Sequence, residues 1–308
     1  MATAVQAVEF MKPAAAPPRL IVPKRTAVFA ARAHRFDALA ADHALGDWLR
    51  LLGRLTRAQH DALQDFPAVA LPRRDGLAPS HDHDMPPLLA QNWPRDSRWQ
   101  HVLMALLDAC ADQVPAAGHA ALRSLRAAPA DQLESLADRV LHTELYGAHA
   151  GALPWVAAAL QVYWTHLAIC LGDEGIRPLE VPGVCPCCGF LPVASVVRSG
   201  GAISGLRYLH CALCNTEWNL VRVKCAACDA NDAIAYRQLA GKGADGPALV
   251  RAETCDSCGS YLKILYQEQD PHADPVADDL ATLALDILVD EAGYSRCGPN
   301  LLLAPGSA

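Results

Sequence analysis

Apolar residues recur at helical spacing through the first half of the chain. Phe29, Phe36 and Leu39 start the pattern, and the residues from 48 to 63 continue it. Residues three or four positions apart lie on one face of an α-helix, so the pattern predicts helices that bury one face in a shared core. After a proline-rich break from 67 to 94, four further helices are predicted, over 98–114, 116–127, 131–146 and 153–171. The links between them are short, which favours antiparallel packing in a bundle.

The pattern changes between Val181 and Leu265, where short apolar runs alternate with turn residues. Arg198-Ser-Gly-Gly201, for example, is a hairpin signal between two such runs. The predicted strands are 191–197, 203–210, 216–223, 233–239, 248–254 and 261–267. They divide into two consecutive sets of three, so this segment predicts two small three-stranded ribbons.

A last helix is predicted near the C-terminus. Asp274 followed by Pro275 is a favourable helix start, and Gly293 is placed to end the helix. The apolar positions of this helix are Val276, Leu280, Leu283 and Ile287. Residues 266–308 contain eight acidic residues and one arginine, so we expect an acidic helix face exposed to water.

Eight of the twelve cysteines stand in four Cys-x-x-Cys pairs within the strand-rich segment. The pairs are Cys185 with Cys188, Cys211 with Cys214, Cys225 with Cys228, and Cys255 with Cys258. Two intervening residues let a tight turn point both sulfurs at one centre, and four sulfurs complete the tetrahedron that zinc or iron accepts. The sequence therefore predicts two four-sulfur metal sites.

The residue after each pair supports this interpretation. Gly189, Asn215, Asp229 and Gly259 are all types that tolerate the positive φ at which a metal-binding knuckle commonly turns. The segment also repeats itself when the first pair is aligned with the third. The repeat favours one site from the first two pairs and one from the last two, and the two crossed arrangements stay open.

A ribbon of about 40 residues buries too little apolar surface to offset its conformational entropy, so a bound metal is expected to hold each fold together. A purely structural metal is the commoner use of such ribbons. Redox or signalling use is the alternative.

The composition limits the class of protein. The chain has 308 residues, of which 52% are apolar, and this apolar share excludes global disorder. The formal net charge of -7 argues against a polyanion as the main partner. The apolar segment 152–171 contains Gln161 and His166, so a buried helix is expected rather than a membrane span. The first 25 residues show no secretory signal, and the cysteines are paired as for metal, so a reducing cytoplasm fits.

The predicted fold class is therefore α+β, with an N-terminal helical bundle, two tandem four-cysteine ribbons of the zinc-ribbon kind and a C-terminal helix. The expected division is a proline-interrupted flexible tail at 1–25, a helical domain at 26–180, ribbons at 181–224 and 225–270, and an acidic helix and tail at 271–308.

Other potential ligands are weaker candidates. His166 and Cys170 are four residues apart on one predicted helix, but no third member is identifiable, so a core pair is expected. His81-Asp-His-Asp84 lies in the proline-rich break, where we expect a solvated loop because nothing fixes a metal geometry. Cys110 lies in an apolar run and is expected to be buried.

Taken together, these residues resemble the family of the formate dehydrogenase accessory protein FdhE. The resemblance rests on six stretches: Cys185-Pro-Cys-Cys-Gly189, Tyr208-Leu-His-Cys-Ala-Leu-Cys-Asn-Thr-Glu-Trp218, Val221-Arg-Val-Lys-Cys225, Glu253-Thr-Cys-Asp-Ser-Cys258, Tyr261-Leu-Lys-Ile-Leu-Tyr266 and Val276-Ala-Asp-Asp-Leu280. It covers the C-terminal part of the chain specifically and the helical half more loosely.

The resemblance implies a cytoplasmic, non-enzymatic protein that is needed to make active respiratory formate dehydrogenase and acts on the catalytic subunit before export. It also implies rubredoxin-like iron at the eight paired cysteines, with zinc as the alternative because thiolate tetrahedra hold both metals. Cys187 departs from the pattern, since an apolar residue is expected there. Two spacers are the usual knuckle geometry, so we interpret Cys187 as a free thiol near the site rather than a competitor of Cys188.

The leading hypothesis is a maturation factor that recognises the immature catalytic subunit. In a weaker hypothesis, the acidic C-terminal segment attracts a basic region of that partner. The runner-up is a nucleic-acid-binding tandem zinc ribbon with Trp218 and Tyr261 as stacking faces, which the net charge of the chain opposes. A redox enzyme with a metal-free Cys-x-x-Cys dithiol is third, and the βαβ unit that it needs is not visible.

Overall fold

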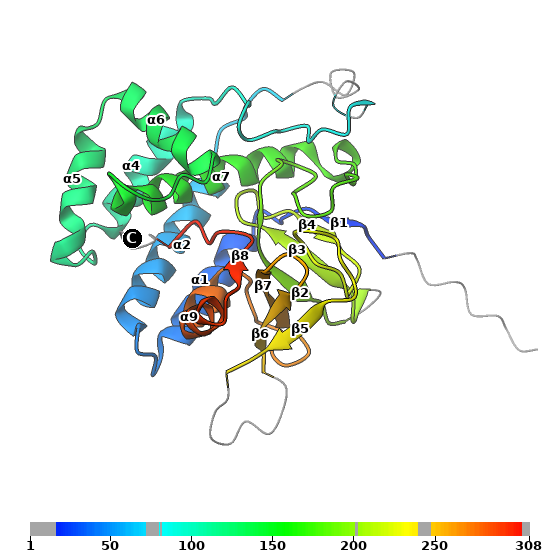
Figure 1. Cartoon of the computed structure of the whole chain (residues 1–308). Helices are drawn as coiled ribbons and strands as arrows, with labels where there is room; N and C mark the ends of the chain where they lie inside the picture. The colour runs from blue at the N-terminus through cyan, green and yellow to red at the C-terminus, as the bar shows by residue number, and fades with distance from the viewer. Residues whose placement is uncertain (1–16, 72–79, 81, 201–202, 240–247, 304–308) are drawn as a thin grey trace, which may run out of the picture.

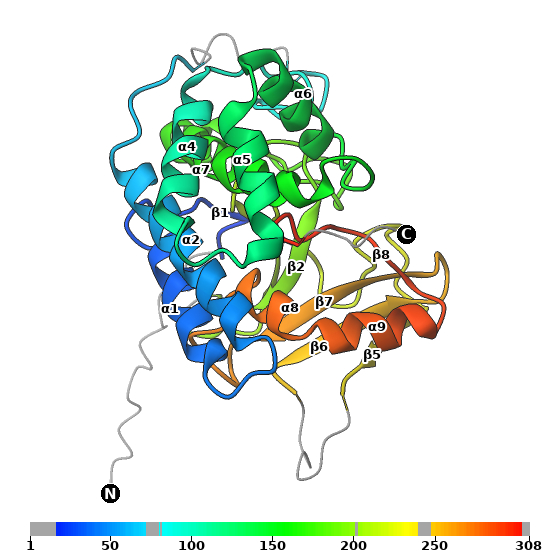
Figure 2. The same cartoon turned by 90° about the vertical axis from the view of Figure 1, so that its left-hand side faces the viewer.

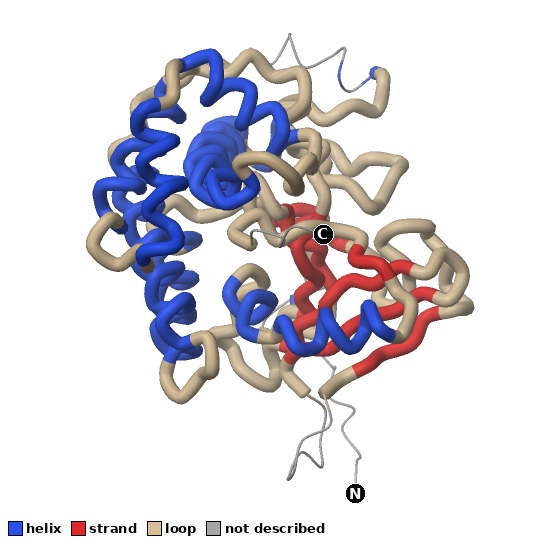
Figure 3. Tube along the Cα trace, turned by 60° about the vertical axis from the view of Figure 1, so that its left-hand side comes forward, coloured by secondary structure: helices blue, strands red, loops and turns tan. Residues whose placement is uncertain are grey.

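The helices expected from the apolar pattern are present in the computed structural model, which describes residues 17–71, 80, 82–200, 203–239 and 248–303. They are α1 (Val28–Ala40), α2 (Gly46–Gln64), α4 (Arg98–Cys110), α5 (His119–Ala127), α6 (Ala130–Leu141) and α7 (Leu153–Leu171). Short 3-10 helices occupy Ala116–Gly118, Ala150–Ala152 and Asp173–Gly175. Figures 1 and 3 show these helices gathered on one side of the molecule and the strands on the other, which confirms the α+β class.

The centre of the helical region is α7. Leu153 and all residues from 155 to 168 are buried, and α2, α4 and α6 pack against this helix. The segment Ala150–Leu171 is long and apolar enough to cross a membrane, but 83% of its apolar window lies inside the protein. A helix that is apolar on all sides is satisfied in a protein core, so the prediction of a buried helix is confirmed.

All strands of the described chain belong to one sheet. They are β1 (Leu20–Ile21), β2 (Pro192–Val197), β3 (Arg207–Cys211), β4 (Glu217–Asn219), β5 (Ile234–Arg237), β6 (Val250–Cys255), β7 (Ser260–Tyr266) and β8 (Ser295–Arg296). Their order is β1-β4-β3-β2-β7-β6-β5, and β8 pairs with β7. The two predicted antiparallel sets of three are present, β2 to β4 and β5 to β7.

The two sets are joined rather than separate. Strands β2 and β7 pair in parallel, with Ser195 opposite Ile264 and Val197 opposite Tyr266. An outer strand carries unpaired backbone N–H and C=O groups, and pairing the two outer strands satisfies both rows. The expectation of two free-standing ribbons is therefore replaced by one continuous sheet.

The predicted flexible tail, residues 1–25, extends too far, because its last residues are part of the folded structure. Strand β1 pairs antiparallel with β4, placing Leu20 opposite Trp218, and the Tyr208 hydroxyl donates to the Pro18 carbonyl at 2.7 Å. The prolines of this segment interrupt a helix but are compatible with an extended edge strand. Residues 1–16 of the predicted tail lie outside the described residues.

The predicted C-terminal helix is broken and its polarity is different from that expected. Two helices replace it, α8 (Ala277–Ala281) and α9 (Leu283–Glu291), because Thr282 between them leaves the helical conformation. Asp278 and Asp279 are buried, whereas Ile287 is 59% exposed. Figure 2 shows α8 beside α1 and α9 lying along the sheet.

The burial of Asp278 and Asp279 has an electrostatic cause. Asp278 pairs with Arg35 of α1 at 2.6 Å, and Asp279 pairs with Lys263 and Arg296. These cations need counter-charges inside the protein, so the acidic residues turn inward. The expectation of a water-exposed acidic face is wrong at these positions, and the charge-attraction hypothesis loses two of its acidic groups.

Candidate metal centres

The first cluster of four sulfurs lies where the strand set β2–β4 meets the helical region. We call it the first quartet, and its members are Cys185, Cys188, Cys211 and Cys214. All four sulfurs lie within 4.8 Å of one another, and all four residues are buried. The closest pairs are Cys185 with Cys214 and Cys188 with Cys211, each at 3.5 Å between sulfurs.

The second cluster lies in the strand set β5–β7. This second quartet consists of Cys225, Cys228, Cys255 and Cys258, whose sulfurs also lie within 4.8 Å of one another. Its closest sulfur pairs are 3.7 Å apart. Cys228 and Cys258 are exposed, and the Ser260 hydroxyl lies 2.9 Å from the Cys258 sulfur. The structure thus brings the cysteines together in the arrangement that the repeat favours, with the second quartet more open to solvent.

The knuckle turns are those expected from the sequence. Gly189, Asn215, Asp229 and Gly259 have φ values of 72°, 59°, 66° and 66°, which confirms the predicted left-handed positions. In three of these turns the backbone N–H donates to the carbonyl of the first cysteine, as from Gly189 to Cys185 at 2.8 Å. Such turns direct both side chains of a pair to one point.

The spacing of the sulfurs fits a four-thiolate metal site. A tetrahedron with metal–sulfur bonds of about 2.3 Å has sulfur–sulfur edges of about 3.8 Å. The closest sulfur pairs, at 3.5 and 3.7 Å, approach that edge length. Backbone amides of Cys214 and Ala227 also reach cysteine sulfurs at 3.4 Å, and such donors stabilise thiolate charge.

The proline-rich break covers the first quartet. The amides of Leu88 and Ala90 donate to the carbonyls of Cys187 and Cys188 at 3.0 and 2.9 Å. A side chain at Gly189 would come within 2.7 Å of the end of the Leu89 side chain, which would have to shift, and the positive φ of Gly189 is the stronger reason for glycine at this position. This loop, which sequence reasoning left without a role, excludes water from the first knuckle.

Cys187 is buried beside the first quartet but is not one of its four converging members. Hydrogen bonding to Cys214 and burial raise the pKa of the Cys187 thiol well above its ordinary value. The pKa values of the quartet thiols Cys185 and Cys188 are raised as well, so it is the convergence of the other four sulfurs that supports the interpretation of Cys187 as a free thiol near the site.

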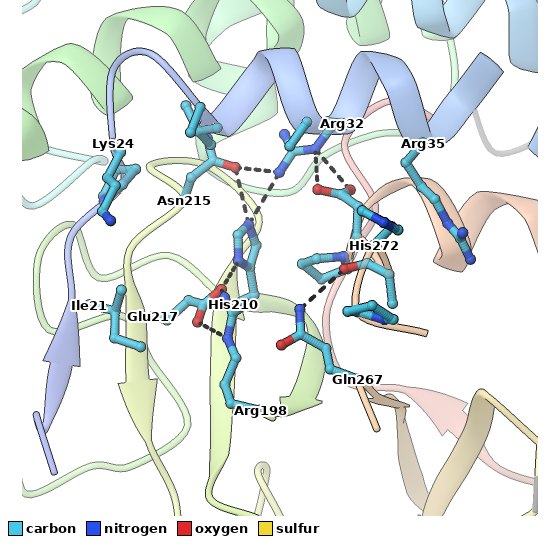
Figure 4. Close-up of a pocket in the computed structure, with 18 of the residues that line it drawn as sticks. Ile21, Lys24, Arg32, Arg35, Arg198, His210, Asn215, Glu217, Gln267 and His272 are labelled. Carbon is cyan, nitrogen blue, oxygen red and sulfur yellow. Dashed lines mark hydrogen bonds and ion pairs between the residues drawn. The ribbon is translucent and has the colours of Figure 1, made fainter. Parts of the chain in front are cut away.

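A polar network backs the second knuckle of the first quartet, between His210, which precedes Cys211, and Asn215, which follows Cys214 (Figure 4). His210 Nδ1 lies 2.9 Å from Glu217, and its Nε2 lies 3.1 Å from Asn215. Arg32 of α1 donates to Asn215 at 2.8 Å and pairs with Asp274 at 3.0 Å. The network joins the knuckle to both ends of the described chain.

Glu217 carries the negative charge at the base of this network. Burial by itself raises the pKa of Glu217, but Arg198 and His210 outweigh it and lower that pKa to about 2. Arg198 donates to Glu217 through Nε at 2.9 Å. Sequence reasoning missed this network because His210, Asn215 and Glu217 form no recognised ligand or catalytic spacing, and their partners Arg32 and Asp274 lie far away along the chain.

The weaker ligand candidates have other roles. His166 is buried and Cys170 exposed, with the Cys170 sulfur 3.5 Å from His166 Nε2. Arg25 is the third member that the sequence did not reveal, and it donates to His166 Nδ1 at 3.0 Å. Burial, and then the charge of Arg25, lower the pKa of His166 to about 4. Cys110 is buried, as predicted.

The described residues of the His81-Asp-His-Asp84 group do not form a cluster that could hold a metal ion. His81 lies outside the described residues, and the other three are exposed. The carboxylate of Asp84 accepts a hydrogen bond from the Glu180 amide at 2.9 Å.

The aromatic faces suggested for nucleic-acid stacking are not available. Trp218 is buried and donates to the Pro182 carbonyl at 2.7 Å. Tyr261 is also buried and donates to Asp286 at 2.8 Å. Stacking on bases requires an exposed ring, so this support for the nucleic-acid alternative is removed.

Three family models match successive parts of the chain. The model described as "FdhE, N-terminal" matches residues 17–180, "FdhE, central domain" matches 184–222, and "FdhE, C-terminal domain" matches 223–303. The matches together include both quartets.

Individual proteins are similar over almost the whole chain. A Pseudomonas aeruginosa protein named "Protein FdhE homolog" is 43% identical over 291 residues, covering 94% of each chain. An Escherichia coli protein named "Protein FdhE" is 37% identical over 290 residues, covering 94% of this chain and 92% of that one. The crystal structure of the FdhE protein from Pseudomonas aeruginosa superimposes with a TM-score of 0.85 at 42% identity, covering 94% of this chain and all of the other.

Proposed function

Because the chain belongs to the FdhE family of formate dehydrogenase accessory proteins, we propose that it is a cytoplasmic maturation factor that binds the immature catalytic subunit of a respiratory formate dehydrogenase. The observation that carries this proposal is the family relationship along residues 17–303, which includes the helical region and both quartets. The role is one of binding and protection, and it assigns no catalytic residue to the chain.

We further propose that each quartet holds one metal ion, iron by preference and zinc as the alternative. The converging sulfurs and the knuckle amides support one four-thiolate metal ion in each quartet, and the preference for iron comes from the resemblance to the family. Four-thiolate iron can exchange one electron, whereas zinc can act only as a clamp. In either case the cysteines of each quartet fix the ends of their strand set, which stabilises the surface offered to the partner.

We keep the boundary between the helical region and the ribbons near residue 180 in this proposal. The two ribbons from 181 to 270 would present one continuous sheet surface, because β2 and β7 join the two strand sets. The partner would therefore meet one joined sheet rather than two separate ribbons.

Co-purification tests the proposed partner directly. The tagged full-length chain is expressed together with the catalytic subunit in cells that cannot make its active-site cofactor, and the retained protein is quantified. We expect the immature subunit to be retained more strongly than the mature enzyme. Retention of neither form would contradict the proposal.

Cysteine variants separate the role of the quartets from general stability. Cys211→Ala and Cys255→Ala each remove one member of a quartet, and both are expected to reduce retention of the subunit. Cys110→Ala, which changes a buried thiol in α4, is the matched control and should leave retention unchanged. Elemental analysis and a visible spectrum of the same samples distinguish iron, which absorbs as a ferric thiolate, from zinc, which does not.

A further inference from the structure

A cavity of about 800 Å³ lies between the N-terminal segment, the sheet and the segment from 267 to 275 (Figure 4). Its walls come from three distant parts of the chain: Ile21 to Ala38, the strand residues around His210, and the residues leading into α8. None of the eight quartet cysteines lines it. The cavity is therefore separate from the quartets, although the polar network behind the first quartet also lines it: Arg32, Arg198, His210, Asn215, Glu217 and Asp274.

The acidic residues in the cavity are already neutralised. Glu217 pairs with Arg198, and Asp274 pairs with Arg32. These are the only two carboxylates among the described lining residues. A ligand would therefore meet no unpaired negative charge in this part of the protein.

Positive charge in the cavity is not fully neutralised. Lys24 is exposed at the cavity wall, and its ammonium group has no acceptor among the residues that the structure describes. The exposed imidazoles of His34 and His272 also line the cavity, where each can offer a hydrogen-bond donor. The balance of unpaired groups in the cavity thus favours an anion.

One buried side chain and one helix end add to the positive potential on this side. Arg32 lines the cavity and is fully buried, and its Nη1 has no acceptor among the described residues, although Nε and Nη2 are both bonded. A buried donor of this kind is normally satisfied by a ligand or by water held beneath one. The first turn of α1, which also lines the cavity, has neither a side-chain cap nor an acidic residue. The amides of Ala27 and Val28 already donate to the Lys24 carbonyl, so it is the dipole of α1 that favours negative charge here.

The remaining wall is apolar. It includes Ile21, Val28, Ala31 and Ile203. Cavities of about 300–1,000 Å³ with an apolar lining and a few polar groups are typical of small-molecule sites. The volume of this cavity falls in that range.

We propose that this cavity binds a small organic oxyanion, a phosphate or carboxylate joined to an apolar body. Lys24 and the first turn of α1 would hold the oxyanion, and the apolar wall would cover the body. The proposal stands apart from the maturation role, so either can fail without the other.

Isothermal titration of the full-length protein tests the proposal with three probes: phenyl phosphate, benzoate and phenol. We expect saturable binding of at least one of the two anions and much weaker binding of phenol, and the comparison shows which oxyanion is preferred. Absence of anion binding up to about 10 mM, which is weaker than millimolar affinity, would overturn the proposal. Equal binding of phenol would overturn it as well, because the site would then be merely apolar.

Two exposed variants locate the site without disturbing the buried network. Lys24→Met should weaken anion binding about fivefold, the effect of losing one partly exposed charge contact. Arg123→Met on α5 removes an exposed cation elsewhere and should have no effect. Identical affinities of these two variants would contradict the assignment.

A cavity-filling variant provides the second location test. Ala31→Phe places a ring in the cavity from an exposed helix position and should abolish binding, whereas Ala120→Phe on α5 should not. The imidazole NMR signals of His34 and His272 should shift on titration with phenyl phosphate. Binding that persists in Ala31→Phe with unshifted imidazole signals would place the anion elsewhere and overturn the proposal.

Discussion

Lys263 shows how single residues in this protein hold buried charge. Its ammonium group is fully buried and donates to the carbonyls of Asp279 and Thr282 at 2.8 and 3.0 Å. The Asp279 carboxylate accepts from Arg296 and Asn300, each at 2.8 Å. Burial by itself raises the pKa of Asp279, but Arg296 and Lys263 outweigh it, so the pKa lies below its ordinary value.

Asp279→Asn tests this cluster. The substitution keeps the shape of the side chain but removes one of the two carboxylates that pair with both Lys263 and Arg296, and Asp286 is then their remaining counter-charge. Weakening the buried cluster in this way should cost up to about 3–5 kcal/mol, the cost of breaking a buried pair outright. Urea denaturation at pH 7 should show that loss. Asp290→Asn, at an exposed position of α9, is the control and should change the free energy of unfolding little.

The effect of Asp279→Asn on stability should depend on pH. Because the pKa of Asp279 is lowered in the folded state, its stabilisation is complete above its ordinary pKa and is lost as the pH falls through the folded value. The difference in unfolding free energy between the wild type and Asp279→Asn should be constant from pH 7 to about 5 and shrink only below about pH 4. Loss of metal in acid affects both proteins and cancels in the difference. A difference that shrinks already between pH 7 and 5 would show that another group controls the cluster.

Cys187 and Cys188 give a second prediction for single residues. Cys188 belongs to the first quartet, whereas Cys187 lies beside it. Cys187→Ala should therefore retain two metal ions per chain, and Cys188→Ala should retain one. Elemental analysis of the purified variants decides the matter, and loss of metal from Cys187→Ala would make that thiol a ligand.

At the scale of elements, the two quartets differ in how they are covered. The loop carrying Leu88 and Ala90 bonds to the first knuckle, and α7 reaches that loop through Trp164, whose Nε1 lies 3.3 Å from the Leu88 carbonyl. Among the residues that the structure describes, no such loop covers Cys228 and Cys258 of the second quartet, which are exposed. The two quartets thus have similar sulfur spacing, but solvent reaches the second more easily than the first.

Unequal access predicts two rates of metal release. A coloured chelator added to the loaded protein should remove one equivalent of metal quickly, from the second quartet, and the other slowly, because attack on buried sulfurs requires local opening. In Cys258→Ala the fast phase should disappear while the slow phase keeps its rate. A single phase accounting for both equivalents in the wild type would contradict this difference between the quartets.

The elements themselves were largely predictable, because helices, strands and knuckles depend on neighbours along the chain. The left-handed turn after each cysteine pair, for example, follows from the local need to point two sulfurs at one centre. The parallel pairing of β2 with β7 could not be predicted, since it joins Ser195 to Ile264 across both ribbons. The inward turn of Asp278 likewise depends on Arg35, which lies far away in the sequence.

At the scale of the whole molecule, the N-terminal and C-terminal parts of the described chain are tied together. Helix α1 packs on α2 and also on α8, and its Arg32 and Arg35 pair with Asp274 and Asp278. Strand β1 adds a further link by pairing with β4 of the first strand set. The helical region, the sheet and the C-terminal helices therefore share one set of contacts, and we expect them to unfold together.

Two optical signals can test this cooperativity. Five of the six tryptophans, Trp48, Trp93, Trp99, Trp155 and Trp164, lie in the helical half, whereas visible absorbance of the loaded protein reports the quartets. Both signals should change at the same urea concentration.

Arg35→Met removes a nearly buried ion pair with Asp278, and it should lower both midpoints by the same amount, corresponding to about 2–4 kcal/mol. Arg50→Met, which breaks an exposed pair with Asp47, should leave both midpoints in place. If Arg35→Met moved only the fluorescence transition, the quartets would unfold independently of the helices, and the helical region and the sheet would not form one cooperative unit.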